Sequence, residues 1–174
     1  MADPSSSRLH GSSSRLHGPA WGLLLGGAAG VLGLALLPPF VSPAWRAVLM
    51  SAFAPVCHQL PVRSPFLGGV QIAICDRCAG IYLGVVLGVA TVAVGRRFWR
   101  AAGRHAPLVL LGSLGPVGVD WVGPLLGLWP NTPLSRAATG LVFGVAAGSF
   151  AAARLLRRAR SMGAPSDASG PAGP

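Results

Sequence analysis

Charged side chains are scarce in this sequence, and two of the four common charged residue types are absent. Glu and Lys do not occur, so 14 arginines carry the basic charge against 4 acidic residues, and only 10% of the 174 residues are charged. Soluble domains usually have roughly a quarter of their residues charged. Together with a hydrophobic fraction of 52%, this composition argues against an ordinary soluble domain and favours one membrane-embedded domain.

The sequence also lacks the signatures of several enzyme and nucleic-acid-binding classes. It has no HExxH, nucleophile elbow, P-loop or GxGxxG motif. The net charge of +10 is high, but with no Lys and one Tyr the chain has no basic patch interleaved with aromatic residues. We therefore expect no nucleic-acid partner, and the motifs do not decide whether the protein is an enzyme.

Four apolar segments approach the length of about 20 residues that a helix needs to cross a bilayer. They cover residues 20–38, 79–95, 106–128 and 137–154. We predict an all-α, integral membrane four-helix bundle over residues 20–158. Disordered tails are expected at 1–19, where a heptapeptide occurs twice in tandem, and at 159–174. The apolar stretch 44–56 contains Arg46 and predicts a short interfacial or re-entrant helix.

The arginines cluster beside the apolar segments and predict the orientation of the chain. They occur in the N-terminal tail, in the second connection and after the fourth segment: Arg8, Arg15, Arg96, Arg97, Arg100, Arg104, Arg154, Arg157, Arg158 and Arg160. Arginine-rich connections face the cytoplasm. We therefore expect a multi-pass protein of the cell (inner) membrane with both termini cytoplasmic. The lipid bilayer is the expected partner, and a homo-oligomer or a partner membrane protein stays open.

Glycines recur at every fourth residue in three of the four segments. The three stripes are Gly22, Gly26 and Gly30; Gly80, Gly84 and Gly88; and Gly140, Gly144 and Gly148. Residues four apart share a helix face, and glycine lets two membrane helices approach closely. The stripes predict tight packing in a helix bundle.

The third segment contains a carboxylate, Asp120, which falls in the outer half of the membrane in this topology. Acidic residues at such depth usually face the protein interior or water. Its partner could be Arg77, Arg136, His58 or a metal ion. Asp120 could therefore serve as an acid–base group or ligand, or form an ion pair that holds the bundle together.

All three cysteines and one histidine lie in the predicted outer loop: Cys57, His58, Cys75 and Cys78. A Cys-x-x-Cys pair can direct two thiolates at one tetrahedral ion, and zinc accepts both Cys and His ligands. The sequence predicts a site for zinc or another thiophilic metal. Because adjacent side chains diverge in regular structure, Asp120 could replace His58 as the fourth ligand. Arg77 and Arg136 would balance the charge.

Other interpretations of these residues stay open. A disulfide or a metal could clip the loop to the second segment without further function. The chain could be a membrane thiol-disulfide oxidoreductase that uses Cys75 and Cys78, because thiols outside a bacterial cell tend to be oxidised. It could also be a small transporter or channel component that uses Asp120.

Two blocks of this sequence resemble a known family. The run Cys57-His-Gln-Leu-Pro-Val-Arg-Ser64 and the run Gln71 to Gly84 are similar to the signature blocks of the DUF2085 family of prokaryotic membrane proteins. The resemblance implies a membrane protein with a Cys/His motif and no established activity. Asp76 and Ala79 depart from the family pattern, which has a small residue and a hydroxyl residue there.

The resemblance also implies a set of motif residues. They are Cys57, His58, Gln59, Pro61, Arg63, Ser64, Cys75, Arg77, Cys78, Gly80, Tyr82, Asp120, Asn131 and Arg136.

Overall fold

The computed structural model describes residues 19–94 and 105–162, and these are mostly helical. The helices are α1 (Pro19–Leu36), α2 (Pro43–Phe53), α3 (Asp76–Val94), α5 (Ala106–Leu125) and α6 (Pro133–Met162), with 3₁₀ turns η3 (Pro38–Phe40) and η4 (Pro61–Arg63) and strands β1 (Phe66–Leu67) and β2 (Val70–Gln71). The four long helices fall on the four predicted apolar segments, and α2 falls on the apolar stretch 44–56. Most of both predicted tails and the arginines of the second connection lie outside the described residues.

Prolines mark several of the helix boundaries. Pro38 follows the end of α1 and starts η3, and Pro43 and Pro133 are the first residues of α2 and α6. Proline fits the first turn of a helix, where its missing N–H would have no helical partner. The sequence therefore specifies where these helices begin.

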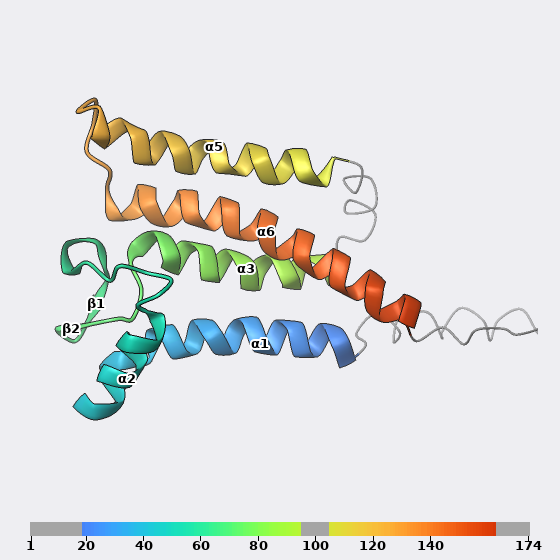
Figure 1. Ribbon diagram of the computed structural model, residues 1–174, viewed down its shortest axis with the longest axis horizontal. Helices are drawn as coiled ribbons and strands as arrows, with labels where there is room; N and C mark the ends of the chain where they lie inside the picture. Colours follow the sequence, from blue (N-terminus) through green and yellow to red (C-terminus); the bar gives the residue numbers. More distant parts are fainter. Residues whose placement is uncertain (1–18, 95–104, 163–174) are drawn as a thin grey trace, which may run out of the picture.

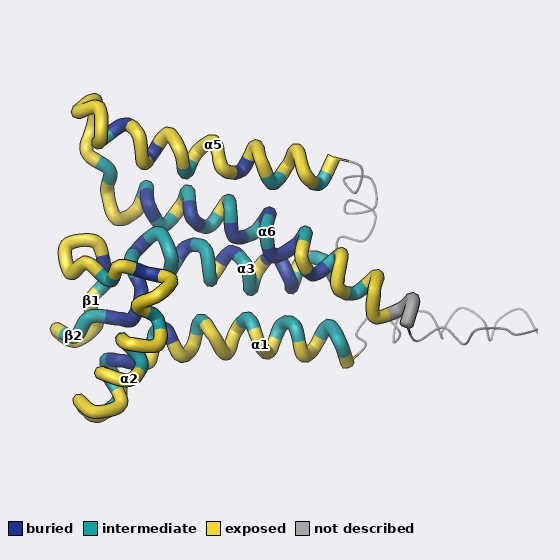
Figure 2. Tube along the Cα trace, viewed as in Figure 1, coloured by how far each residue is buried: buried dark blue, intermediate teal, exposed yellow. Residues whose placement is uncertain are grey.

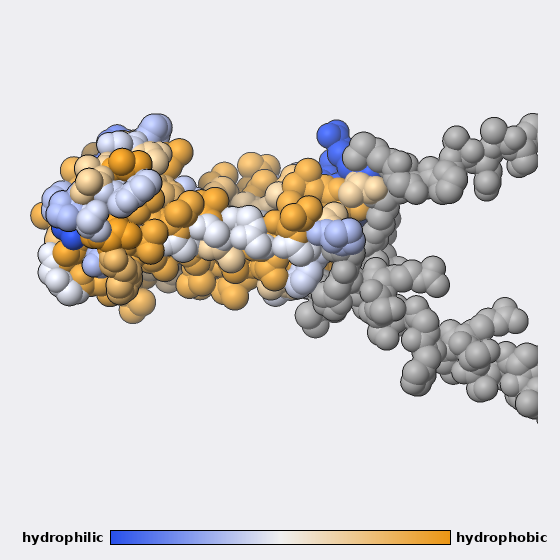
Figure 3. Space-filling model, turned by 90° about the horizontal axis from the view of Figure 1, so that it is seen from below, coloured by the Kyte–Doolittle hydropathy of each residue, from blue (hydrophilic) through white to orange (hydrophobic). Residues whose placement is uncertain are grey.

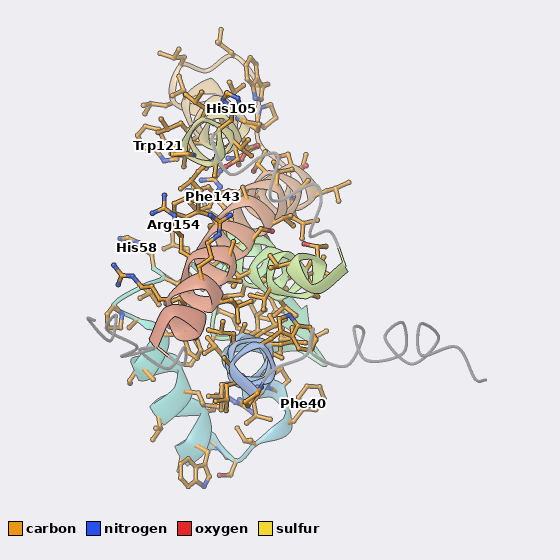
Figure 4. All side chains as sticks on the ribbon, turned by 90° about the vertical axis from the view of Figure 1, so that its right-hand side faces the viewer. Phe40, His58, His105, Trp121, Phe143 and Arg154 are labelled. Carbon is orange, nitrogen blue, oxygen red and sulfur yellow. The ribbon has the colours of Figure 1, made fainter. Side chains whose placement is uncertain are left out.

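The four long helices lie side by side in the order α1, α3, α6 and α5, seen both from the side and along their axes (Figures 1 and 4). Helices α3 and α6 run in the same direction and form the most extensive contact of the described chain, whereas α1 lies mainly against α3 and α5 against α6. The molecule is therefore built on one central parallel pair with one helix added on each side.

Glycines explain why α3 and α6 lie so close together. A Cβ at Gly148 would lie 2.6 Å from the carbonyl oxygen of Val85 in α3, and a Cβ at Gly88 would lie 2.5 Å from that of Val145 in α6. The predicted stripes of these two helices are thus packed against each other. The prediction is wrong for α1, because added Cβ atoms at Gly22, Gly26 and Gly30 would meet nothing within 4 Å.

The outer faces of the helices are apolar. Within the described ranges, three helices are long and apolar enough to cross a membrane: Pro19–Leu36, Ala106–Leu125 and Pro133–Ala159. Helices α1 and α5 are largely exposed (Figure 2), and the surface along the helices is mainly hydrophobic with polar patches toward the ends (Figure 3). Exposed apolar area of this extent fits contact with lipid.

The chain between α1 and α3, which includes α2 and the β1–β2 hairpin, forms a compact cap on one end of the helices (Figure 1). The hairpin turns at Gly68 and Gly69, whose φ values of 56° and 77° suit glycine. After β2 the buried residues Ile72 to Ile74 run past the end of α1, where the Ala73 N–H donates to the Ala35 carbonyl at 3.0 Å. This cap delivers the chain to the start of α3.

Candidate metal centre at the start of α3

The structure brings the three cysteines together in the cap. Cys57 follows α2, Cys75 immediately precedes α3, and Cys78 lies in the first turn of α3. Their sulfur atoms all lie within 4.8 Å of one another. Residues 18 apart in sequence therefore meet beside one Cys-x-x-Cys turn.

Apolar packing and one hydrogen bond hold Cys57 in place. Its side chain is buried, with 4% exposure, in a small core that also contains Ala35, Ile72 and Ile74. The backbone N–H of Cys75 donates to the Cys57 sulfur at 3.2 Å. Such a contact orients the sulfur toward the Cys-x-x-Cys turn before any ion binds.

The spacing of the sulfurs suits a thiophilic ion. In a tetrahedral zinc site with Zn–S bonds of about 2.3 Å, neighbouring sulfurs are about 3.8 Å apart. The three sulfurs, all free thiols, lie within 4.8 Å of one another, so rotations of the side chains would suffice to close them on an ion. A set of three sulfur donors favours zinc or Cu(I) over hard cations.

The surroundings of the Cys75 thiol lower its pKa. Hydrogen bonding from the Cys78 thiol lowers the pKa of Cys75 to about 5, and backbone N–H groups of Cys78 and Arg77 act in the same direction against the opposing effect of burial. A thiolate at neutral pH is the form that binds metals and attacks disulfides.

His58 is not part of the sulfur cluster. Its side chain is exposed, and Figure 4 shows it at the edge of the molecule, pointing away from the helices. Asp120 also lies outside the cluster, because its carboxylate pairs with Arg77 and accepts a hydrogen bond of 2.7 Å from the Ser135 hydroxyl. The structure thus brings three of the predicted ligands together and gives Asp120 other partners.

A network of buried polar groups borders the cluster and joins α3, α5 and α6. Arg136 of α6 donates to Asp76 of α3, with the closest contact at 2.7 Å, and both side chains are 9% exposed. The same guanidinium donates to the Asn131 side-chain oxygen at 2.9 Å, and the Asn131 amide donates to the Asp120 carbonyl at 3.1 Å. Asp76, the departure from the family pattern, is thus neutralised by Arg136.

Other motif residues hold the cap together. The Gln59 amide donates to the carbonyls of Met50 and Ala73 at 2.8 and 2.9 Å. The buried Ser64 hydroxyl donates to the Leu60 carbonyl at 2.9 Å, and Tyr82 packs edge-on against Phe53. These contacts give the three side chains structural roles around the cysteines.

A cavity of about 410 Å³ opens beside the sulfur cluster, and all three cysteines are in its wall. The rest of the wall combines apolar side chains, three arginines and two further polar groups: Val56, His58, Gln59, Leu60, Arg63, Arg77, Ile81, Trp121 and Arg136. Four of these wall residues were not predicted as site residues: Val56, Leu60, Ile81 and Trp121. Trp121 follows Asp120 in sequence near the end of a predicted span, where tryptophan is enriched, and this signal could have identified it.

Comparison with known proteins places the chain in a family. Residues 57–150 match the family described as "Predicted membrane protein (DUF2085)". An uncharacterized protein of Methanocaldococcus jannaschii is 30% identical over 105 residues, which cover 58% of this chain and 65%, or less than two thirds, of that relative. No solved structure matches the chain. The chain belongs to the DUF2085 family, which confirms the resemblance seen in its sequence.

Proposed function

We propose that this DUF2085 membrane protein binds one zinc ion or another thiophilic metal ion through Cys57, Cys75 and Cys78, on the outer side of the cell membrane. The observation that carries the proposal is the convergence of three free thiols within 4.8 Å of one another. They come from two segments of the cap, so the ion would tie the loop after α2 to the start of α3.

The proposed membrane arrangement has four spans, with α3 added to the three apolar helices. The cap and the cysteines lie at one end of the helices, whereas Arg154, Arg157 and Arg158 lie toward the opposite end of α6. Arginines of this kind favour the cytoplasmic side, so the cap would face outward. A membrane-impermeant thiol reagent applied to intact cells should then label the metal-free cysteines, and labelling only after lysis would contradict this orientation.

The direct test of the metal site uses one detergent-purified sample that has never met a chelator. We expect one equivalent of metal per chain and three thiols that become reactive only after the metal is removed. Cys57→Ser, Cys75→Ser and Cys78→Ser should each lose the metal, whereas Ala54→Ser, an exposed change in the same loop, should retain it. Metal-free protein from metal-replete cells, with freely reactive thiols, would refute the proposal.

A second candidate is thiol-disulfide exchange through Cys75 and Cys78. The observation that favours it is the lowered pKa of Cys75, about 5, beside an open cavity. In metal-free protein the iodoacetamide reaction of Cys75 should rise as pH increases through 5 and level off by pH 7, since the thiolate predominates above the pKa. An ordinary thiol has a pKa of about 8.5.

Mixed-disulfide trapping separates the two functions. If the protein is an oxidoreductase, its Cys78→Ala variant should accumulate a mixed disulfide between Cys75 and a protein or glutathione partner. A protein that only binds metal should give no such adduct above the level of the Cys75→Ala, Cys78→Ala double variant.

A further inference from the structure

We infer that the metal centre has one open coordination position and that a small thiol carrying a carboxylate binds the ion there from the cavity. This inference deepens the proposed function and rests on it. Structural zinc sites are closed by four protein ligands, whereas functional sites have three and keep one position for an exogenous ligand. Among the residues that the structure describes, the candidate cluster holds three ligands and no fourth His, Asp or Glu.

The location of the cavity supports an open position. All three cysteines contribute to the wall of this space of about 410 Å³, so an ion held by them would border the cavity. Cys75 and Cys78 are only partly buried. A ligand of a few heavy atoms could therefore reach the ion without movement of the backbone.

Arg63 is the cation in the cavity wall that can anchor an acidic group of a ligand. Arg77 and Arg136 are paired with Asp120 and Asp76, so those two arginines contribute little net charge. Three thiolates around a divalent ion leave a formal charge of −1, and the exposed Arg63 in the same wall forms neither of the two ion pairs found in the described ranges. Arg63 thus offsets the charge of the site and can meet a carboxylate.

The apolar residues of the cavity wall indicate what the rest of the ligand is like. Val56, Leu60, Ile81 and Trp121 supply apolar surface next to the sulfur cluster. Small-molecule sites typically combine such surface with a few polar anchors. A sulfur donor suits an ion already held by thiolates, and this combination points to a small organic thiol with one carboxylate.

The test uses full-length protein loaded with Co(II), whose absorption reports the number and type of ligands. We expect mercaptoacetate to change the sulfur-to-cobalt charge-transfer and d–d bands with saturation at one equivalent, while cobalt stays bound after gel filtration. Acetate, which lacks sulfur, should cause no change. Arg63→Ala should weaken mercaptoacetate binding about two- to fivefold and leave the binding of 2-mercaptoethanol, which lacks the carboxylate, unchanged.

His58→Ala distinguishes an open position from one filled by the protein. The inference expects this variant to have the same cobalt spectrum as the parent before any thiol is added. A changed spectrum would make His58 the fourth ligand and overturn the inference, as would cobalt-loaded protein that does not respond to mercaptoacetate. A protein that binds no cobalt at all would instead refute the proposed metal site itself.

Discussion

The glycine stripes of α3 and α1 have the same spacing, but only the stripe of α3 packs closely against another helix in the described structure. Gly84 of α3 lies against the backbone of Leu141 and Gly144 in α6, so closely that no Cβ would fit. Gly26 of α1 also has a glycine four residues before it and four residues after it, yet an added Cβ would meet nothing within 4 Å. The comparison teaches that periodic glycine permits close packing of helices but does not by itself select a partner.

Buried polar contacts also join α3 and α6. At the end of the pair beside the cap, Arg136 and Asp76 form a buried ion pair. Farther along, the fully buried Ser149 hydroxyl donates to the Gly88 carbonyl at 3.1 Å. These contacts fix which faces meet and in which register, because a shift along either helix would leave the buried groups without partners.

The largest effect is expected from removing the ion pair. Arg136→Leu leaves Asp76 buried without its cation and should destabilise the protein by about 3–5 kcal/mol. Unfolding in mixed detergent micelles, followed by circular dichroism, measures this loss. Arg154→Leu on the same helix is the control, because Arg154 is exposed and its stacking on Phe150 should contribute about 1 kcal/mol or less. Equal losses in the two variants would show that the ion pair does not hold the helices together.

A matched pair of glycine substitutions tests the comparison directly. Gly84→Ala places a methyl group against the backbone of α6 and should cost about 1–3 kcal/mol, as overpacking does. Gly26→Ala adds the same group to open space and should change stability by roughly 0.5–1 kcal/mol at most, in the stabilising direction, because alanine favours helix. The same micelle unfolding assay measures both. A destabilised Gly26→Ala protein would indicate that the α1 stripe is covered in the membrane.

The smallest effect is expected at the Ser149 contact between α3 and α6. Ser149→Ala removes one buried hydrogen bond and should cost about 1 kcal/mol. The matched control is Ser113→Ala, because the bond that the Ser113 hydroxyl makes among the described residues is to the Leu110 carbonyl of its own helix. A Ser149→Ala loss no greater than that of Ser113→Ala would assign register to the glycines and the ion pair alone.

Much of the helical framework could be predicted from composition. Apolar length alone located the four long helices, and the stretch broken by Arg46 became the short helix α2. The order α1, α3, α6, α5 could not be predicted, because it depends on which glycine faces meet, and all three stripes look alike in sequence. Hydrophobicity places a helix in the bilayer but does not distinguish its neighbours.

The candidate site could be predicted from the sequence only in part, because its ligands are visible in the sequence but the contacts between helices are not. The Cys-x-x-Cys spacing and the arginine distribution predicted sulfur ligands at one end of the helices. Asp120 had four candidate partners, and only the three-dimensional arrangement selects Arg77 among them. Asp76 could be recognised as a departure from the family pattern, but its pairing with Arg136 depends on contact between two helices, and the paired residues are 60 apart in sequence.

That separation has a consequence for how the chain is made. Asp76 leaves the ribosome 60 residues before Arg136, and at about 5–20 residues per second this interval lasts roughly 3–12 s. During this time the carboxylate and the glycines of α3 lack their final partner, because α5 is synthesised before α6. The ion pair and the packed glycines of α3 and α6 can therefore form only after the whole of α5 has been synthesised.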